Sequence, residues 1–114
     1  MANVLVIDDE KMIRGLVKQA LSAVNYEVDT AYAGDDGIRK FNSGKYDLVI
    51  TDVCMPGVDG NVVIHHIRSS HRKGTPVIGM SGTPWLLDNN GFDRVLPKPF
   101  GIKALIDTAK DLTG

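Results

Sequence analysis

Short apolar runs alternate with helix-periodic segments along the 114 residues of this chain, and this alternation restricts the fold more than any other feature. Most of the runs are rich in β-branched residues and apolar on both faces, which is typical of strands buried inside a sheet. The predicted strands are Val4–Ile7, Val28–Tyr32, Leu48–Thr51, Val77–Met80 and Arg94–Leu96.

Apolar residues recur at helical spacing between Met12 and Val24, which predicts a long amphipathic helix that ends near Asn25. Shorter helical patterns cover residues 34–43, 62–67 and 102–112. Strands that alternate with helices predict an α/β fold, a doubly wound five-stranded parallel sheet with helices on both faces. With no linker or internal repeat, we expect residues 1–114 to form one domain.

Composition excludes several classes of partner and compartment. Thirteen basic and fourteen acidic residues give a formal net charge of −1, so the chain lacks the basic excess that direct binding to nucleic acid or an anionic membrane favours. The single cysteine, Cys54, cannot form an internal disulfide. The apolar amino terminus is interrupted by acidic residues at position 8 and is neither a signal peptide nor a membrane span. We therefore expect a soluble cytoplasmic protein.

Chemically complementary side chains follow four of the predicted strands. The residues are Asp8, Asp9 and Glu10 after the first strand, Asp52 after the third, Ser81 after the fourth and Lys98 after the fifth. In open α/β sheets the ligand crevice lies at the carboxyl ends of the strands, so these side chains should converge there. A single acid at a strand end is usually a helix cap or a loop residue, but coincidence at four ends is improbable.

Clustered carboxylates repel one another, and a hard divalent cation relieves that repulsion. Oxygen ligands favour Mg²⁺, and no cysteine–histidine set indicates zinc. Lys98 supplies a positive charge for a phosphate oxygen, and Ser81 supplies a hydrogen-bond donor. An aspartate in such a site can act as a nucleophile and form an aspartyl phosphate.

Four motifs together resemble the response-regulator receiver domain of two-component signalling. They are VLVIDDE at 4–10, DLVITDVCMPGVDG at 47–60, PVIGMSG at 76–82 and PKPF at 97–100, which occur in the family's order over nearly the whole chain. The resemblance implies a flavodoxin-like fold with strand order 2-1-3-4-5. It also implies a signalling switch, rather than an enzyme acting on a separate substrate.

The resemblance assigns a role to each matching residue. Asp52 is the implied phosphoacceptor, and its donor is a histidine kinase, a histidine phosphotransfer protein or acetyl phosphate. Mg²⁺ is implied to bind Asp9 and Asp52 directly, Asp8 mostly through a water, and the backbone carbonyl of Cys54.

Two further roles concern the phosphoryl group itself. Lys98 is implied to pair with it, and Ser81 is implied to swing towards it and so change the following loop. The change of conformation would signal to a downstream output protein, which the sequence does not identify.

The chain departs from the family pattern in two places. Val95 stands where many relatives have an aromatic switch residue, three positions before Lys98. Residues 82–93 are too few for a full helix with its loops, so we expect a fourth helix that is short or absent, around Trp85-Leu86-Leu87. The apolar side chains of this segment, with Phe92, either cover the sheet, which we favour, or form an exposed partner surface.

Other interpretations stay open at this point. A phosphohydrolase of the haloacid dehalogenase or another Mg²⁺-dependent type would also use an aspartyl phosphate. Such an enzyme needs a second acid that protonates the leaving group and a segment that caps the substrate, and the sequence shows neither. A degenerate receiver would act only as a binding module, against which the intact acidic and lysine residues argue. His65, His66 and His71 fit no zinc spacing, and we assign them to a solvated helix face.

Overall fold

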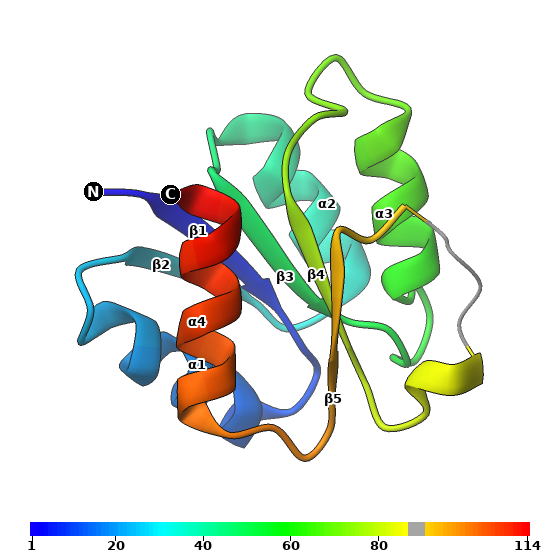
Figure 1. Cartoon of the computed structure of the whole chain (residues 1–114). Helices are drawn as coiled ribbons and strands as arrows, with labels where there is room; N and C mark the ends of the chain where they lie inside the picture. The colour runs from blue at the N-terminus through cyan, green and yellow to red at the C-terminus, as the bar shows by residue number, and fades with distance from the viewer. Residues whose placement is uncertain (87–90) are drawn as a thin grey trace.

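All five strands lie in one parallel sheet. The computed structural model describes residues 1–86 and 91–114. The strands are β1 (Asn3–Ile7), β2 (Glu27–Ala31), β3 (Leu48–Asp52), β4 (Val77–Ser81) and β5 (Arg94–Pro97). Their order in space is β2-β1-β3-β4-β5, and every pair is parallel (Figure 1). The predicted fold class and strand order are confirmed.

Helices cover both faces of the sheet. The four α-helices are α1 (Lys11–Ser22), α2 (Gly34–Ser43), α3 (Gly60–Arg68) and α4 (Ile102–Thr113). Figure 1 shows α1 and α4 on one face and α2 and α3 on the other. Two hydrophobic clusters follow this division, one containing Leu21 of α1 and Leu105 of α4, the other Phe41 of α2 and Ile67 of α3.

The central strands are buried on both faces, which explains their continuous apolar sequences. In β1, Val4 and Val6 face the α1–α4 cluster, whereas Leu5 and Ile7 face the α2–α3 cluster. All five residues of β3 and all five of β4 are buried. Because the register pairs Val6 with Ile50 of β3, the carboxyl ends of the two strands lie level with each other.

Local backbone features set the ends of the elements. Asn25 has a φ of 72°, in the left-handed region that asparagine tolerates, and lies in the turn after α1 as predicted. The second strand lies one residue earlier than predicted, because its pairing with β1 runs from Asn3–Glu27 to Ile7–Ala31 and leaves Tyr32 outside the sheet. Asp59 caps α3 by accepting hydrogen bonds from the backbone of Asn61 and Val62.

The segment between β4 and β5 contains one short helical turn in its described part. This turn is η1 (Pro84–Leu86), a 3₁₀ helix of three residues. Leu87 and the side chain of Leu86 lie outside what the structure describes. The expected reduction of the helix at Trp85 is confirmed.

The favoured interpretation of the apolar side chains in this segment is half right. Trp85 is 75% exposed, so it does not cover the sheet as we predicted. A three-residue turn has no inner face long enough to bury a large aromatic ring. Phe92 does cover the sheet: it is 9% exposed and packs over Gly79 of β4, where an added Cβ would lie 3.0 Å from the Phe92 ring.

Only part of the apolar stripe predicted for α1 is buried. Val17, Ala20 and Leu21 pack on the sheet, whereas Met12 is 85% exposed and Leu16 is 42% exposed. None of the helices in the described part of the chain has the length and apolar character needed to cross a membrane.

Candidate functional site

The carboxyl ends of the strands bring the predicted polar residues to one edge of the sheet. Asp8 directly follows β1, and its backbone N–H donates to the carbonyl of Ala31 at the end of β2. Asp52 and Ser81 are the last residues of β3 and β4. The backbone N–H of Lys98 donates to the Ser81 carbonyl at 2.8 Å, so Lys98 extends the β4–β5 pairing by one residue.

Lys98 lies among three carboxylates. Its Nζ is 3.2 Å from Asp52 Oδ1, 3.5 Å from Asp8 Oδ2 and 4.0 Å from Glu10 Oε1. One carboxylate oxygen from each of these acids lies within 4.8 Å of the other two. Since one ammonium group faces three carboxylates, the pocket keeps a local excess of negative charge.

Burial and crowding shift the protonation of this pocket. Burial raises the pKa of Asp8 to about 6, and the charges of Asp52 and Glu10 add to the rise. Burial also raises the pKa of Asp52, a rise that Lys98 partly opposes. For Lys98, burial would lower the pKa, but the charges of Asp8 and Asp52 outweigh it and raise the pKa.

The structure places Glu10, and not Asp9, in the acid cluster with Asp8 and Asp52. Asp9 is exposed and is not among the three acids that share oxygen–oxygen distances within 4.8 Å, although its charge contributes to the raised pKa of Asp52. Glu10 is the third acid of this group, although the ligand set implied by the sequence did not include it. Its backbone N–H donates to Asp8 Oδ1 at 2.8 Å, which orients the buried Asp8 carboxylate.

Ser81 and Cys54 lie next to the acids. Ser81 is buried, and its Oγ accepts a hydrogen bond from the backbone N–H of Thr83 at 3.0 Å. Cys54 is exposed, and its backbone hydrogen bond to Asp52 lowers the pKa of that carboxyl. The Cys54 backbone therefore lies against the Asp52 side chain.

A glycine allows the loop after β3 to return to the site. Gly60 donates its N–H to the Val53 carbonyl, and an added Cβ at Gly60 would lie 2.4 Å from the Asp52 carbonyl oxygen. No side chain fits at that distance. The motif Asp59-Gly60 thus ends the loop, caps α3 and holds the loop against Asp52.

The three histidines lie away from this edge. His65 and His71 are exposed, and His66 pairs with Asn42 Oδ1 at 2.7 Å between α3 and α2. Among the described residues, the one group of acids, histidines or cysteines close enough to hold a metal ion is Asp8, Glu10 and Asp52. These oxygen donors carry excess negative charge, and Asp8 and Asp52 have raised pKa values, which fits a hard divalent cation such as Mg²⁺.

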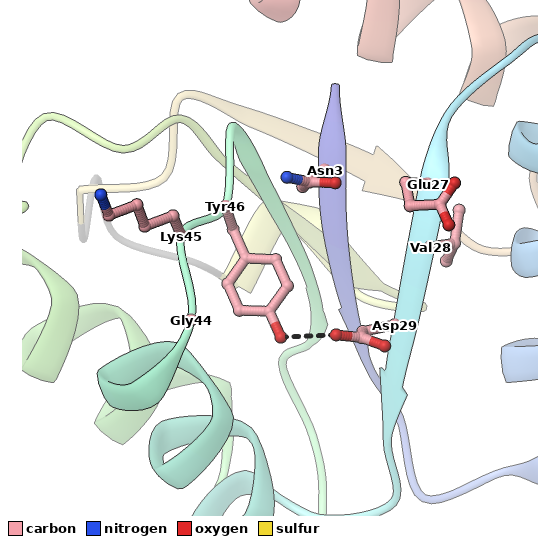
Figure 2. Close-up of a pocket in the computed structure, with 7 residues that line it drawn as sticks. All are labelled: Asn3, Glu27, Val28, Asp29, Gly44, Lys45 and Tyr46. Carbon is pink, nitrogen blue, oxygen red and sulfur yellow. Dashed lines mark hydrogen bonds between the residues drawn. The ribbon is translucent and has the colours of Figure 1, made fainter. Parts of the chain in front are cut away.

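A second hollow lies at the opposite end of the sheet. Its volume is about 270 Å³. Figure 2 shows the residues that line it, among them Asn3 and Glu27, the first residues of β1 and β2. Tyr46 donates its hydroxyl to Asp29 Oδ2 at 2.8 Å, and burial together with this bond raises the pKa of Tyr46 to about 12. This hollow has no excess of buried acids and resembles no part of the predicted site.

Comparison with known proteins agrees with the geometry. The family model of the response regulator receiver domain matches residues 4–110. The chain is 35% identical over 114 residues to the transcriptional regulatory protein ResD of Bacillus subtilis, and 32% identical over 111 residues to the response regulator ArlR of Staphylococcus aureus. These alignments cover 96% and 93% of this chain and 47% and 50% of the relatives. The chain thus spans about half the length of these curated relatives.

Solved structures match along the whole fold. The response regulator TrrA of Thermotoga maritima, in complex with Mg²⁺-BeF, superposes with a TM-score of 0.90 at 37% identity, covering 98% of this chain and 99% of that one. The chemotaxis protein CheY4 of Vibrio cholerae superposes with a TM-score of 0.89 at 28% identity, covering 98% of both chains. The family match, the strand order and the acidic pocket together show that this chain belongs to the response regulator receiver domain family of two-component signalling, whose members act as signalling switches rather than as catalytic enzymes.

Proposed function

We propose that Asp52 is the phosphoacceptor of this receiver and that residues 1–114 form one receiver domain. The observation that carries the proposal is the contact of 3.2 Å between Asp52 Oδ1 and Lys98 Nζ, inside a pocket that holds two further carboxylates. Asp8 is the alternative nucleophile, but it is fully buried and its Oδ1 is occupied by the Glu10 N–H. Asp52 is also buried, but it is 5% exposed, ends β3 at the carboxyl edge of the sheet and lies closer to Lys98 Nζ, so it is the better placed of the two.

Mg²⁺ is the proposed cofactor, held by Asp8, Asp9, Asp52 and the backbone carbonyl of Cys54. The excess of buried negative charge and the oxygen donors support a hard cation here. TrrA, a structural relative at 37% identity, is described with Mg²⁺-BeF bound. When bound, the cation neutralises charge on the phosphoryl oxygens and on the carboxylates.

The side chains of the pocket perform the transfer. A carboxylate oxygen of Asp52 forms a bond to phosphorus while the phosphorus–nitrogen bond of a phosphohistidine breaks, and the imidazole leaves with that electron pair and takes up a proton. Lys98 Nζ pairs with the new phosphoryl group. Ser81 gives up the Thr83 N–H and turns its hydroxyl towards a phosphoryl oxygen, which changes the loop that carries Trp85.

The proposed donor is a histidine kinase or a histidine phosphotransfer protein, and the recipient of the signal is an output protein. An apolar groove of about 370 Å³ supports a protein donor, because Ile13, Leu16 and Phe100 line it beside Glu10 and Lys98 of the acidic pocket. A protein that presents a phosphohistidine at the pocket would thus also cover exposed apolar surface of α1. A cytoplasmic location is part of this proposal, since kinases draw on cytoplasmic ATP.

Intact mass after incubation with acetyl phosphate and Mg²⁺ tests the proposal. We expect the chain to gain one phosphoryl group, Asp52→Ala to gain none, and Asp111→Asn, at an exposed acid of α4, to behave like the native chain. Addition of EDTA should abolish the gain. A gain in Asp52→Ala, or none in the native chain, would contradict the proposal. Repeated turnover of a phosphomonoester would indicate a phosphohydrolase instead.

A further inference from the structure

Glu10 lies at the mouth of the acidic pocket, where the pocket meets the groove on α1. Its side chain is 62% exposed, yet its Oε1 lies 4.0 Å from Lys98 Nζ, and one of its carboxylate oxygens is within 4.8 Å of an Asp52 oxygen. It also lines the apolar groove with Leu16 and Phe100. A phosphodonor that approaches Asp52 therefore passes next to this carboxylate.

The charge of Glu10 opposes the approach of an anion. A phosphoryl group near Asp52 would come as close to Glu10 as the two carboxylates are to each other, and like charges at this distance repel appreciably even near the protein surface. Lys98 is the one cation within 4.0 Å of these three acids in the described part of the chain. Glu10 therefore weakens the attraction that Lys98 offers to an incoming phosphoryl group.

The repulsion falls most heavily on small donors. A protein donor that covers Met12 and Leu16 gains free energy from apolar burial, which offsets the repulsion. A small donor contacts little beyond the charged pocket and has no such compensation. We propose that Glu10 is a specificity-determining residue that disfavours small dianionic phosphodonors at Asp52; this inference rests on the proposed function of Asp52.

Two small donors of different charge separate this effect from a general change in the pocket. Acetyl phosphate is a dianion at neutral pH, and phosphoramidate is a monoanion. With acetyl phosphate, an Asp52 oxygen bonds to phosphorus as the phosphorus–oxygen bond to the acetyl group breaks and acetate leaves with the electron pair. With phosphoramidate, the phosphorus–nitrogen bond breaks and ammonia leaves.

The experiment compares the native chain with Glu10→Gln at saturating Mg²⁺, after Mg²⁺ binding to each has been measured by calorimetry. We expect Glu10→Gln to be phosphorylated about fivefold faster by acetyl phosphate and about twofold faster by phosphoramidate, because the repulsion scales with donor charge. At about 1 M salt, where the Debye length is about 3 Å, both gains should largely disappear. The matched control Glu27→Gln removes an exposed acid at the other end of the sheet and should change neither rate.

The outcomes distinguish this inference from the proposed function. Equal gains with both donors, a slower Glu10→Gln, or an equal gain in Glu27→Gln would overturn the role of Glu10. In each of those cases the native chain would still be phosphorylated at Asp52. If neither donor phosphorylates the native chain, the proposed function itself fails.

Discussion

At the scale of single residues, Asp8 carries an energetic cost that its position imposes. It is fully buried beside two other acids, and its pKa of about 6 compares with an ordinary value of 3.8. Folding therefore favours the protonated form. The protonated Asp8 contributes its full stabilisation below pH 3.8, the ordinary pKa, and this stabilisation is lost as the pH rises from there through 6. Above pH 6 the ionised Asp8 lowers the free energy of unfolding by an amount on the order of 3 kcal/mol.

Substitution of this carboxylate should stabilise the metal-free chain. We expect Asp8→Asn to raise the free energy of unfolding near neutral pH by about 1–3 kcal/mol, since its amide oxygen can still accept the Glu10 N–H. Near pH 4 the gain should vanish, because the native Asp8 is then protonated as well. Urea unfolding in the presence of a chelator measures both values. A loss of stability near neutral pH, or a gain that Asp111→Asn reproduces, would count against the assignment.

Single residues also mark how far the sequence could predict the site. Asp8, Asp52 and Lys98 were predictable because each follows a buried strand, and strand ends share one edge of a parallel sheet. The division between Asp9 and Glu10 was not, because it depends on which way two consecutive side chains point after β1. The exposure of Trp85 was also beyond the sequence, because an apolar residue in a three-residue turn has no periodicity to indicate its direction.

At the scale of elements, Arg68 connects the end of α3 with the segments that lead into β4 and β5. From the end of α3, its guanidinium donates to the carbonyls of Gly91, at 2.7 Å, and Thr75, at 2.7 Å. It also pairs at 2.7 Å with Asp93, whose Oδ2 accepts the Val77 N–H at the start of β4. These bonds fix the approach to β5 where Phe92 covers the sheet.

Loss of this guanidinium should loosen one end of the sheet. We expect Arg68→Ala to lower the free energy of unfolding by about 2–3 kcal/mol, since it leaves several carbonyls and a carboxylate without a charged donor. Arg68→Lys should recover only part of the loss, because an ammonium group cannot reproduce the planar fork. Urea unfolding gives the energies, and amide hydrogen exchange at Val77 and Asp93 locates the change.

The comparison variant for Arg68 is Lys103→Ala, which removes an exposed cation from α4 and should leave the urea midpoint unchanged. If Arg68→Ala were as stable as that variant, or if exchange at Val77 stayed slow, Arg68 would not hold the connection.

Most of the elements could be predicted from the sequence, and the exceptions have physical causes. The strands were identified because central parallel strands are apolar on both faces. The helical pattern of α1 was identified too, but not how much of its apolar stripe is buried. Met12 and Leu16 match that pattern, yet the face of α1 that packs on the sheet is formed by Val17, Ala20 and Leu21, and Met12 and Leu16 remain on the surface.

At the scale of the whole molecule, a net charge of −1 conceals a strongly uneven distribution. Asp8, Glu10 and Asp52 gather at one edge of the sheet against the ammonium group of Lys98. The two hydrophobic clusters on either side of the sheet fix the strands whose ends carry these acids. The stability of the fold is therefore linked to the charge of the site, although the site contributes little apolar packing.

This linkage predicts how Mg²⁺ affects the stability of the whole chain at different pH values. A cation that binds the folded state and not the unfolded chain raises the free energy of unfolding by about 2.7 kcal/mol at a concentration one hundred times its dissociation constant. Binding of Mg²⁺ requires the ionised form of Asp8, and the pKa of Asp8 is about 6. Mg²⁺ should therefore raise the melting temperature above about pH 7 and do so progressively less as the pH falls through 6.

Thermal unfolding with Mg²⁺ and with EDTA, across this pH range, measures the effect. Asp52→Asn should lose most of the stabilisation by Mg²⁺ at every pH, because it removes a proposed ligand and one of the charges that attract the cation. Asp8→Asn should lose part of it and should also lose its pH dependence near 6, since the titrating group is gone. Stabilisation of equal size at pH 5 and pH 7 in the native chain would separate the metal from the Asp8 carboxylate. In that case the buried Asp8 carboxylate would pair with Lys98 but would not take part in binding Mg²⁺.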